Sequence, residues 1–176
     1  MTLPPTAQPM TLPDGYGQRS AALLPWTDLS QRLAEAHRYW LATVRPDGRP
    51  HVVPTDGLWV DNAFWFGGSA ETVHYRNLCS NGAAAIHLED GTRAIIVEGR
   101  ARLTTPSSEQ AHTLAALSKS KYGFAAPVET YMAEIWLLSP TRVLAWNNFP
   151  TDATRFRFGD QGRPGQAAQH GAVPGT

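Results

Sequence analysis

A short polar segment between two strand-like runs carries the side chains best suited to chemistry. Gly67-Gly68-Ser69 interrupts a strand pattern, and the stretch Ser69 to Asn81 is too charged and too rich in small residues to be a strand. Its side-chain donors are Thr72, His74, Arg76 and Asn77. Donors gathered beside a glycine-rich turn suit an anion such as phosphate. The sequence therefore predicts a phosphate-binding segment.

Other kinds of catalytic site find little support. The histidines form no pair at i, i+4 with a glutamate, and Cys79 has no partner motif, so we expect no metal site. No Gly-x-Ser-x-Gly sequence places a serine on a strand-to-helix elbow. Four tyrosines could each donate a proton, but nothing distinguishes one of them: Tyr39, Tyr75, Tyr122 and Tyr131. We name no catalytic acid or base.

The elements that must position the polar segment begin with a strand hairpin. Tyr39 to Val44 is rich in aromatic and β-branched residues, and Pro46-Asp47-Gly48 is a turn whose glycine can adopt a positive φ. Pro50 to Val60 is the second arm, and we expect both of its faces to be covered because it shows no clean alternation. Asp61-Asn62 then turns the chain into the strand Ala63 to Phe66, which completes a meander.

Two helices are expected around these strands. Asp28 to Arg38 is amphipathic behind the N-cap Thr27, with Leu29, Leu33 and Ala36 on one face. Thr105-Pro106 caps a second helix that Gly123 ends. Its apolar face carries Ala111, Leu114 and Leu117.

Further strands follow the polar segment. Ala83 to Leu88 is the fourth strand, Asp90-Gly91 is a hairpin turn, and Ala94 to Leu103 is the fifth strand. Glu134 to Leu138 and Arg142 to Trp146 supply closing strands, with a bend at Pro140 between them. The predicted fold is mainly β with α: a barrel of six or seven mostly antiparallel strands with two or more helices. We expect the barrel to close, because closure removes exposed strand edges.

Length and composition set the domain organisation. With 176 residues, 19.2 kDa and 42% apolar content, the chain suits one core. We expect residues 1–25 to form a flexible N-terminal arm, residues 26–158 the folded domain and residues 159–176 a flexible tail. The arm could instead wrap a partner subunit through Tyr16, Leu23 and Leu24. Six tryptophans are many for so small a core, so we expect some at a homodimer interface.

Charge and cysteine content bear on partners and compartment. The formal net charge is zero and the Lys and Arg residues are scattered, which argues against nucleic acid as a partner. One cysteine cannot form an internal disulfide, and no leader-like start or membrane-length apolar run is evident. We expect a cytoplasmic protein with no membrane partner.

The order and spacing of several runs resemble a known superfamily. These are Trp40 to Pro54, Arg76-Asn77-Leu78, Ile86 to Glu89 and the tail Ala153 to Phe158. Together they are similar to the pyridoxamine 5'-phosphate oxidase-like split-barrel superfamily, most closely to its small flavin- and deazaflavin-dependent members. The resemblance covers roughly Trp26 to Phe158. It implies a homodimeric split β-barrel that binds FMN or F420 at the dimer interface.

The resemblance also implies cofactor-binding positions. Family members hold the cofactor phosphate with Ser/Thr and Lys/Arg side chains after the third strand; Thr72 matches the hydroxyl, and His74 stands where relatives usually carry Lys. Arg76 either substitutes for that Lys or points elsewhere. The second strand would follow the flavin ring through Val52, Val53, Pro54 and Thr55.

Residues near the end of the domain have two interpretations each. In the family, residues after the last strand reach the partner subunit's cofactor, which is the role implied for Trp146; core packing is the alternative. Arg155 either pins the tail or reaches the cofactor.

Two functional hypotheses from different classes follow. The first is an oxidoreductase that binds FMN or F420 and transfers hydride to or from a small planar substrate. The alternative is a non-catalytic split-barrel protein that binds a cofactor, haem or another flat ligand. A true pyridoxamine phosphate oxidase is a weaker third hypothesis, because the basic and aromatic tail of that enzyme is not evident.

Overall fold

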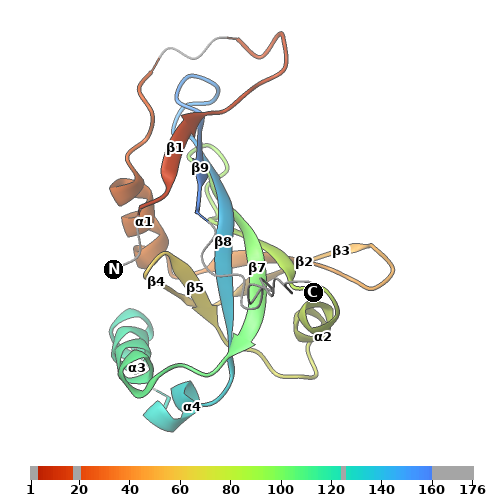
Figure 1. Cartoon of the computed structure of the whole chain (residues 1–176), viewed down its shortest axis with the longest axis vertical. Helices are drawn as coiled ribbons and strands as arrows, with labels where there is room; N and C mark the ends of the chain where they lie inside the picture. Colours follow the sequence, from red (N-terminus) through yellow and green to blue (C-terminus); the bar gives the residue numbers. More distant parts are fainter. Residues whose placement is uncertain (1–3, 18–20, 124–125, 160–176) are drawn as a thin grey trace, which may run out of the picture.

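A computed structural model describes residues 4–17, 21–123 and 126–159 of the chain. Over these residues, nine strands form one antiparallel sheet, and four helices lie around it (Figure 1). The elements are β1 (Thr6–Pro9), α1 (Trp26–Glu35), β2 (Tyr39–Val44), β3 (Pro50–Thr55), β4 (Leu58–Val60), β5 (Ala63–Phe66), α2 (Val73–Ser80), β6 (Ala83–His87), β7 (Ile95–Thr104), α3 (Ser108–Tyr122), α4 (Val128–Met132), β8 (Ile135–Ala145) and β9 (Thr154–Arg157). The predicted mainly β architecture with helices is confirmed.

The sheet is open, so the expected closed barrel is wrong. The strand order is β1-β9-β8-β7-β6-β2-β3, and β5 joins this path through β8 and pairs on its other edge with β4. The long strand β8 pairs with two strands along one of its edges. Leu138 pairs with Phe64 of β5, and Val143 pairs with Phe156 of β9. Over the described residues the sheet has three end strands, β1, β3 and β4, and no pairing between β3 and β4 closes it.

The stretch Pro50 to Val60 is two strands rather than the single one predicted. The chain turns at Asp56-Gly57, after which β4 pairs with β5 instead of extending β3. The flanking turns are as expected. Gly48 has a φ of 85°, and Asp61 and Asn62 have φ values of 52° and 61°, which suit a tight hairpin turn. The predicted turns are therefore confirmed, whereas the predicted extent of the strand is wrong.

Both predicted helices form, with different starts. Helix α1 begins at Trp26 behind Pro25 instead of behind Thr27, and it buries Leu29 and Leu33. Helix α3 begins with a capping box between Ser107 and Gln110, not at Thr105-Pro106. Its predicted end at Gly123 is confirmed, with a φ of 68°. Leu117 is 41% exposed and lies off the buried face of this helix.

Strand β8 continues through Pro140, where the sequence predicted a bend between two separate strands. Pro140 lies opposite Gly99, beside a register shift between Glu98 and Gly99. A bulge of this kind accommodates a proline because its missing N–H leaves no unmet ladder bond. A Cβ on Gly99 would lie 2.2 Å from the Ser139 carbonyl oxygen, so glycine allows the close approach.

Two features had no counterpart in the prediction. The polar segment after β5 contains the helix α2, capped at its start by the Thr72 side chain. Strand β1, inside the arm expected to be flexible, pairs with β9, so that Ala7 lies opposite Phe156. Residues 160–176 of the predicted tail lie outside the described residues.

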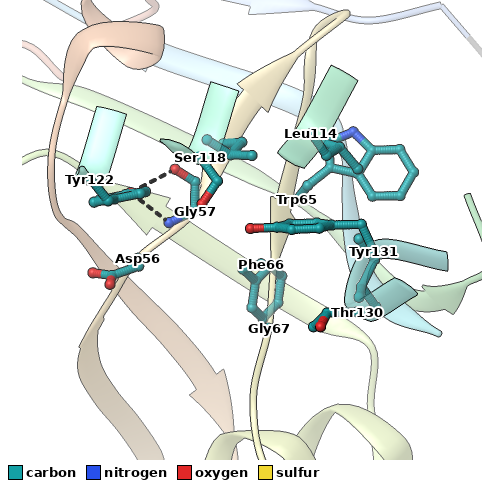
Figure 2. Close-up of a pocket in the computed structure, with 12 residues that line it drawn as sticks. Asp56, Gly57, Trp65, Phe66, Gly67, Leu114, Ser118, Tyr122, Thr130 and Tyr131 are labelled. Atoms are coloured by element: carbon teal, nitrogen blue, oxygen red, sulfur yellow. Dashed lines mark hydrogen bonds between the residues drawn. The ribbon is translucent and has the colours of Figure 1, made fainter. Parts of the chain in front are cut away.

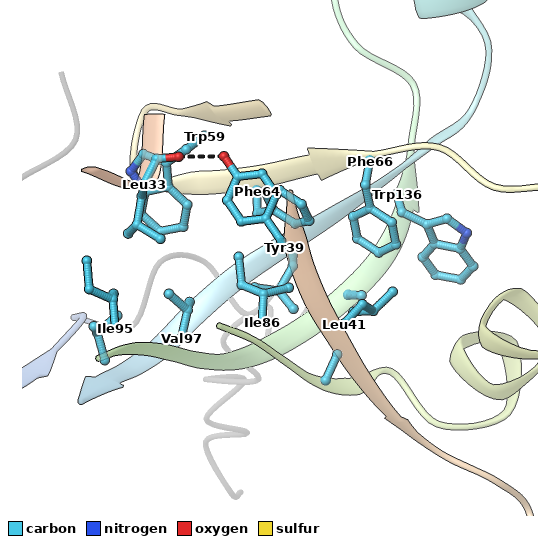
Figure 3. Close-up of a cluster of buried hydrophobic side chains, with 14 of the residues drawn as sticks. Leu33, Tyr39, Leu41, Trp59, Phe64, Phe66, Ile86, Ile95, Val97 and Trp136 are labelled. Atoms are coloured by element: carbon cyan, nitrogen blue, oxygen red, sulfur yellow. Dashed lines mark hydrogen bonds between the residues drawn. The ribbon is translucent and has the colours of Figure 1, made fainter. Parts of the chain in front are cut away.

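The main core combines aromatic and aliphatic side chains and lies between α1 and the sheet (Figure 3). Tyr39 is 1% exposed, and its hydroxyl donates to the Leu33 carbonyl oxygen, which ties β2 to α1. The Tyr39 ring lies 4.5 Å from that of Phe64. Phe66 stacks on Trp136 at 6.3 Å. These contacts hold the start of β2 and the strand β5 in place, and β5 leads directly into the polar segment.

None of the described helices combines the length and the apolar composition that a bilayer span requires.

Candidate functional site

The start of α2 is built from the residues that the sequence singled out. The Thr72 hydroxyl donates to the Ser69 carbonyl oxygen at 2.7 Å and accepts from the Tyr75 amide at 3.4 Å, which caps the helix. The His74 imidazole lies beside this cap, with Nε2 3.3 Å from the Thr72 hydroxyl oxygen. A Cβ on Gly68 would lie 2.7 Å from His74 Nε2, so the glycine turn makes room for the ring.

A groove of about 420 Å³ lies between this helix start, the glycine turn and the end of β3. Its lining residues are Arg38, Pro54, Thr55, Asp56, Gly67, Gly68 and His74. The fold therefore brings together three of the predicted site residues, Pro54, Thr55 and His74, from segments far apart in the sequence. Arg38 and Asp56, from the turns before β2 and after β3, carried no signal in the sequence.

The groove has little net charge. Arg38 and Asp56 form an ion pair, with Nη1 and Oδ1 2.6 Å apart, and both side chains are exposed. His74 is the remaining ionisable group among the lining residues. Burial, and then the charge of His51, lower the pKa of His74 from its ordinary value of 6.5. His51 itself lies on β3, with Nδ1 3.3 Å from an Arg45 guanidinium nitrogen.

Two of the predicted donors on α2 do not line the groove. Arg76 is exposed, and two residues along a helix place it on the side of α2 away from His74. Asn77 is 3% exposed, and its amide donates to the buried Thr43 hydroxyl at 3.0 Å. Asn77 thus anchors α2 to β2.

The other predicted contacts also lie away from the groove. Val52 is 49% exposed on the outer face of β3, and Val53 packs against the main core. Trp146 follows β8, where its ring packs edge-on against Phe149 at 5.2 Å. A cofactor role for these residues stays a prediction.

A second cavity of about 250 Å³ adjoins the groove (Figure 2). It lies between α3, α4 and the strands β4 and β5, and it shares Asp56 and Gly67 with the groove. Its other lining residues are Gly57, Leu58, Trp65, Phe66, Leu114, Ser118, Tyr122, Thr130, Tyr131 and Ile135. The lining is mostly aromatic and aliphatic, with a few polar groups, which is the usual make-up of a small-molecule site.

Two side chains at the end of α3 hold the floor of this cavity. The Tyr122 hydroxyl accepts from the Gly57 amide and donates to the Gly57 carbonyl oxygen, both at 2.9 Å. Lys121 Nζ donates to the same carbonyl at 3.0 Å and to the Tyr39 hydroxyl at 2.8 Å. Burial lowers the pKa of Lys121 to about 8. Tyr122 and Tyr131 were noted in the sequence, but only the fold places them in one cavity.

Across the described ranges, no three His, Cys, Asp or Glu side chains converge as a metal ion would require. The candidate site is a groove with little net charge beside the start of α2, joined to an apolar cavity.

Comparisons with solved structures find proteins of the same fold. A conserved hypothetical protein from Mycobacterium tuberculosis is 21% identical, with 74% of this chain and 89% of that chain covered and a TM-score of 0.60. An F420 reductase is 24% identical, with 75% and 98% covered and a TM-score of 0.50. A haem-binding protein from Mycobacterium smegmatis is 18% identical, with 73% and 57% covered and a TM-score of 0.54. At these identities the likeness shows the fold alone.

The sequence itself places the chain in a family. No curated protein matches it significantly. The family model described as pyridoxamine 5'-phosphate oxidase matches residues 27–147, which is more than half of the chain. The chain belongs to the pyridoxamine 5'-phosphate oxidase-like split-barrel family.

Proposed function

We propose that this protein is an oxidoreductase that binds FMN or F420 in the groove and transfers hydride to or from a small planar substrate in the adjoining cavity. The observation that carries this proposal is the shared wall. Asp56 and Gly67 line both the groove and the cavity, so a ligand in one lies next to a ligand in the other. Family membership and an F420 reductase among the structural neighbours favour a flavin-type cofactor.

The residues of the groove fit the phosphate end of such a cofactor. The start of α2 presents backbone N–H groups and the positive end of the helix dipole, and both attract anions. His74 stands beside this helix start and Arg38 lines the groove with it. Pro54 presents no backbone amide from β3. When bound, the cofactor supplies the redox chemistry, and these residues hold and orient it.

The cavity fits a small planar substrate with few polar groups. Trp65, Phe66 and Tyr131 provide aromatic surface on one side of the cavity, and Tyr122 lies on the other (Figure 2). Aromatic rings bind flat ligands by stacking and edge contacts. Apolar walls also exclude water, which protects a hydride-transfer reaction from side reactions.

We further propose a homodimer in the cytoplasm, with no nucleic acid or membrane partner. Trp40 and Val52 are 37% and 49% exposed on β2 and β3, and large exposed apolar side chains on a sheet face suit a subunit interface. Trp146 would reach the second subunit's cofactor, as the family resemblance implies. The single cysteine, Cys79, is free and exposed, which fits a reducing compartment.

The second candidate function is storage or transport of a flat ligand such as haem. His74 favours it, because an imidazole on a groove wall is a common axial ligand to haem iron. A haem-binding protein is among the structural neighbours. A Soret band after incubation with haem, lost in His74→Ala, would favour this function over the first.

The test is a fluorescence titration of the purified protein with FMN and with F420. We expect saturable binding of one cofactor, weakened at least tenfold in His74→Ala. Arg76→Ala is the matched control, since it removes a charge from the same helix but outside the groove. Absence of saturable binding of both cofactors at micromolar concentration would refute the oxidoreductase proposal.

A further inference from the structure

We infer that the groove binds a phosphate-bearing ligand together with one proton, which His74 takes up at Nδ1. The inference rests on the proposed function only in placing the phosphate at the start of α2. It concerns the imidazole of His74, the one ionisable group of the groove lining that lies outside the Arg38–Asp56 ion pair. Three observations carry it: the hydrogen bonds of the imidazole, the charges of the groove and the burial of the ring.

The hydrogen bonds define the tautomer of neutral His74. The Thr72 hydroxyl has one proton, and its 2.7 Å contact with the Ser69 carbonyl oxygen uses it. At the 3.3 Å contact with His74 Nε2, Thr72 must therefore accept, so Nε2 carries the hydrogen. Nδ1 is then an unprotonated acceptor with no hydrogen-bond partner among the described residues. A lone pair at Nδ1 repels a phosphate oxygen, whereas a protonated Nδ1 donates to it.

The charges around the groove make His74 the group whose protonation state must change when a phosphate binds. Arg38 and Asp56 face His74 across the groove, and they neutralise each other in an ion pair. His51 faces it from β3, and a positive charge there opposes protonation of His74. Arg76, on the same helix, is exposed outside the groove. A phosphate dianion that enters this groove gains a compensating positive charge most directly from His74.

The sign of the effect follows from linkage. In the free protein, partial burial and then the charge of His51 lower the pKa of His74 from its ordinary value of 6.5, so the neutral form prevails at pH 7. A bound phosphate stabilises the imidazolium and raises that pKa. At a pH between the pKa of His74 in the free protein and its pKa in the complex, the complex holds a proton that the free protein lacks. The affinity for phosphate therefore rises as the pH falls, by up to about tenfold per pH unit.

The experiment measures protons and affinity together. Isothermal titration calorimetry with FMN and with F420, in two buffers of different ionisation enthalpy at several pH values, counts the protons taken up. In parallel, NMR follows the imidazole resonances of the full chain with and without FMN, and with inorganic phosphate as a minimal probe. His74→Lys supplies a fixed charge at the same position, and His112→Gln removes an exposed imidazole from α3 as the matched control.

The expected result is proton uptake by the wild type and by His112→Gln that exceeds the uptake by His74→Lys. The phosphate ester's own titration is common to all three proteins and cancels in this comparison. The His74 resonance, assigned by its loss in His74→Lys, should titrate at a higher pH when FMN or inorganic phosphate is present. Equal proton uptake by wild type and His74→Lys, or a His74 pKa unmoved by bound ligand, would overturn the inference.

The two proposals fail in different ways. If neither FMN nor F420 binds at any pH but inorganic phosphate raises the pKa of His74, the proton-linked phosphate site stands and the cofactor proposal falls. If a cofactor binds and the pKa of His74 does not change, the cofactor proposal stands and the inference falls. If neither cofactor binds and inorganic phosphate leaves the His74 resonance unchanged, both the cofactor proposal and the inference are overturned.

Discussion

Lys121 makes the stability of this protein depend on pH in the alkaline range. Its ammonium group is half-buried between the rings of Tyr39 and Tyr122, at 4.9 and 5.5 Å from their centroids. Its pKa is lowered from 10.5 to about 8, chiefly by burial, which Asp56 offsets only in part. Lys121→Met removes the charge and keeps the chain length. The variant should fold, because the two acceptors of Lys121 retain other bonds: Tyr39 donates to Leu33, and the Gly57 carbonyl accepts from Tyr122.

The magnitude follows from the two pKa values. Between pH 8 and 10.5 the unfolded chain keeps a proton on Lys121 that the folded chain has lost. The unfolded state therefore binds more protons, and the free energy of unfolding rises with pH. From pH 7 to pH 9.5 the rise is about 2 kcal/mol without screening. Because the ammonium is partly in contact with solvent, we expect about 1 kcal/mol.

The assay is urea unfolding at pH values from 7 to 9.5 for the wild type, Lys121→Met and Lys119→Met. Lys119 lies on the exposed side of the same helix and serves as the control. The range stops below pH 10, because burial raises the pKa of Tyr39 and tyrosine ionisation in the unfolded chain would then lower stability. We expect the wild type and Lys119→Met to gain stability over the range and Lys121→Met to lack that gain. An equal gain in all three proteins would refute the reasoning.

Two further substitutions test how the site is held. In Gly57→Ala the new methyl would lie 2.2 Å from the ring of the fully buried Phe64, so we expect a loss of about 2–3 kcal/mol by urea unfolding. Gly67→Ala, where a Cβ meets no atom within 4 Å, should change stability by less than about 0.5 kcal/mol; similar losses in both would contradict the steric explanation. Asn77→Ala should cost about 2 kcal/mol, because the buried Thr43 hydroxyl loses its amide donor at 3.0 Å. A thermal melt unchanged from the wild type would show that this bond does not anchor α2.

Local signals in the sequence account for the elements that were predicted well. The turns at Gly48 and at Asp61-Asn62 depend on residues that tolerate a positive φ, and Gly123 ends α3 for the same reason. Apolar spacing located α1 and α3. Their first residues were misplaced because several neighbouring residues can cap a helix, and tertiary contacts choose among them.

Helix α2 has a local signal in the sequence. Thr72 is a good N-cap, and Tyr75 and Leu78 recur at helical spacing behind it, although the polar composition of the segment makes this apolar pattern weak. Once the segment is a helix, its donors separate. His74 faces the groove, Arg76 faces solvent and Asn77 faces the core. Donors that are neighbours in the sequence therefore have different roles in the structure.

By itself, the sequence determined the family and the mainly β character with helices, and it singled out the segment Ser69 to Asn81, whose His74 lines the groove. These follow from turn residues, apolar patterns and the order of short runs, all of which act over a few residues. Only the tertiary structure decided that the sheet stays open, that β1 pairs with β9, and that Asp56 and Gly67 join a groove to an aromatic cavity. Such pairings depend on which distant surfaces pack best together, and that choice is made by the whole chain at once.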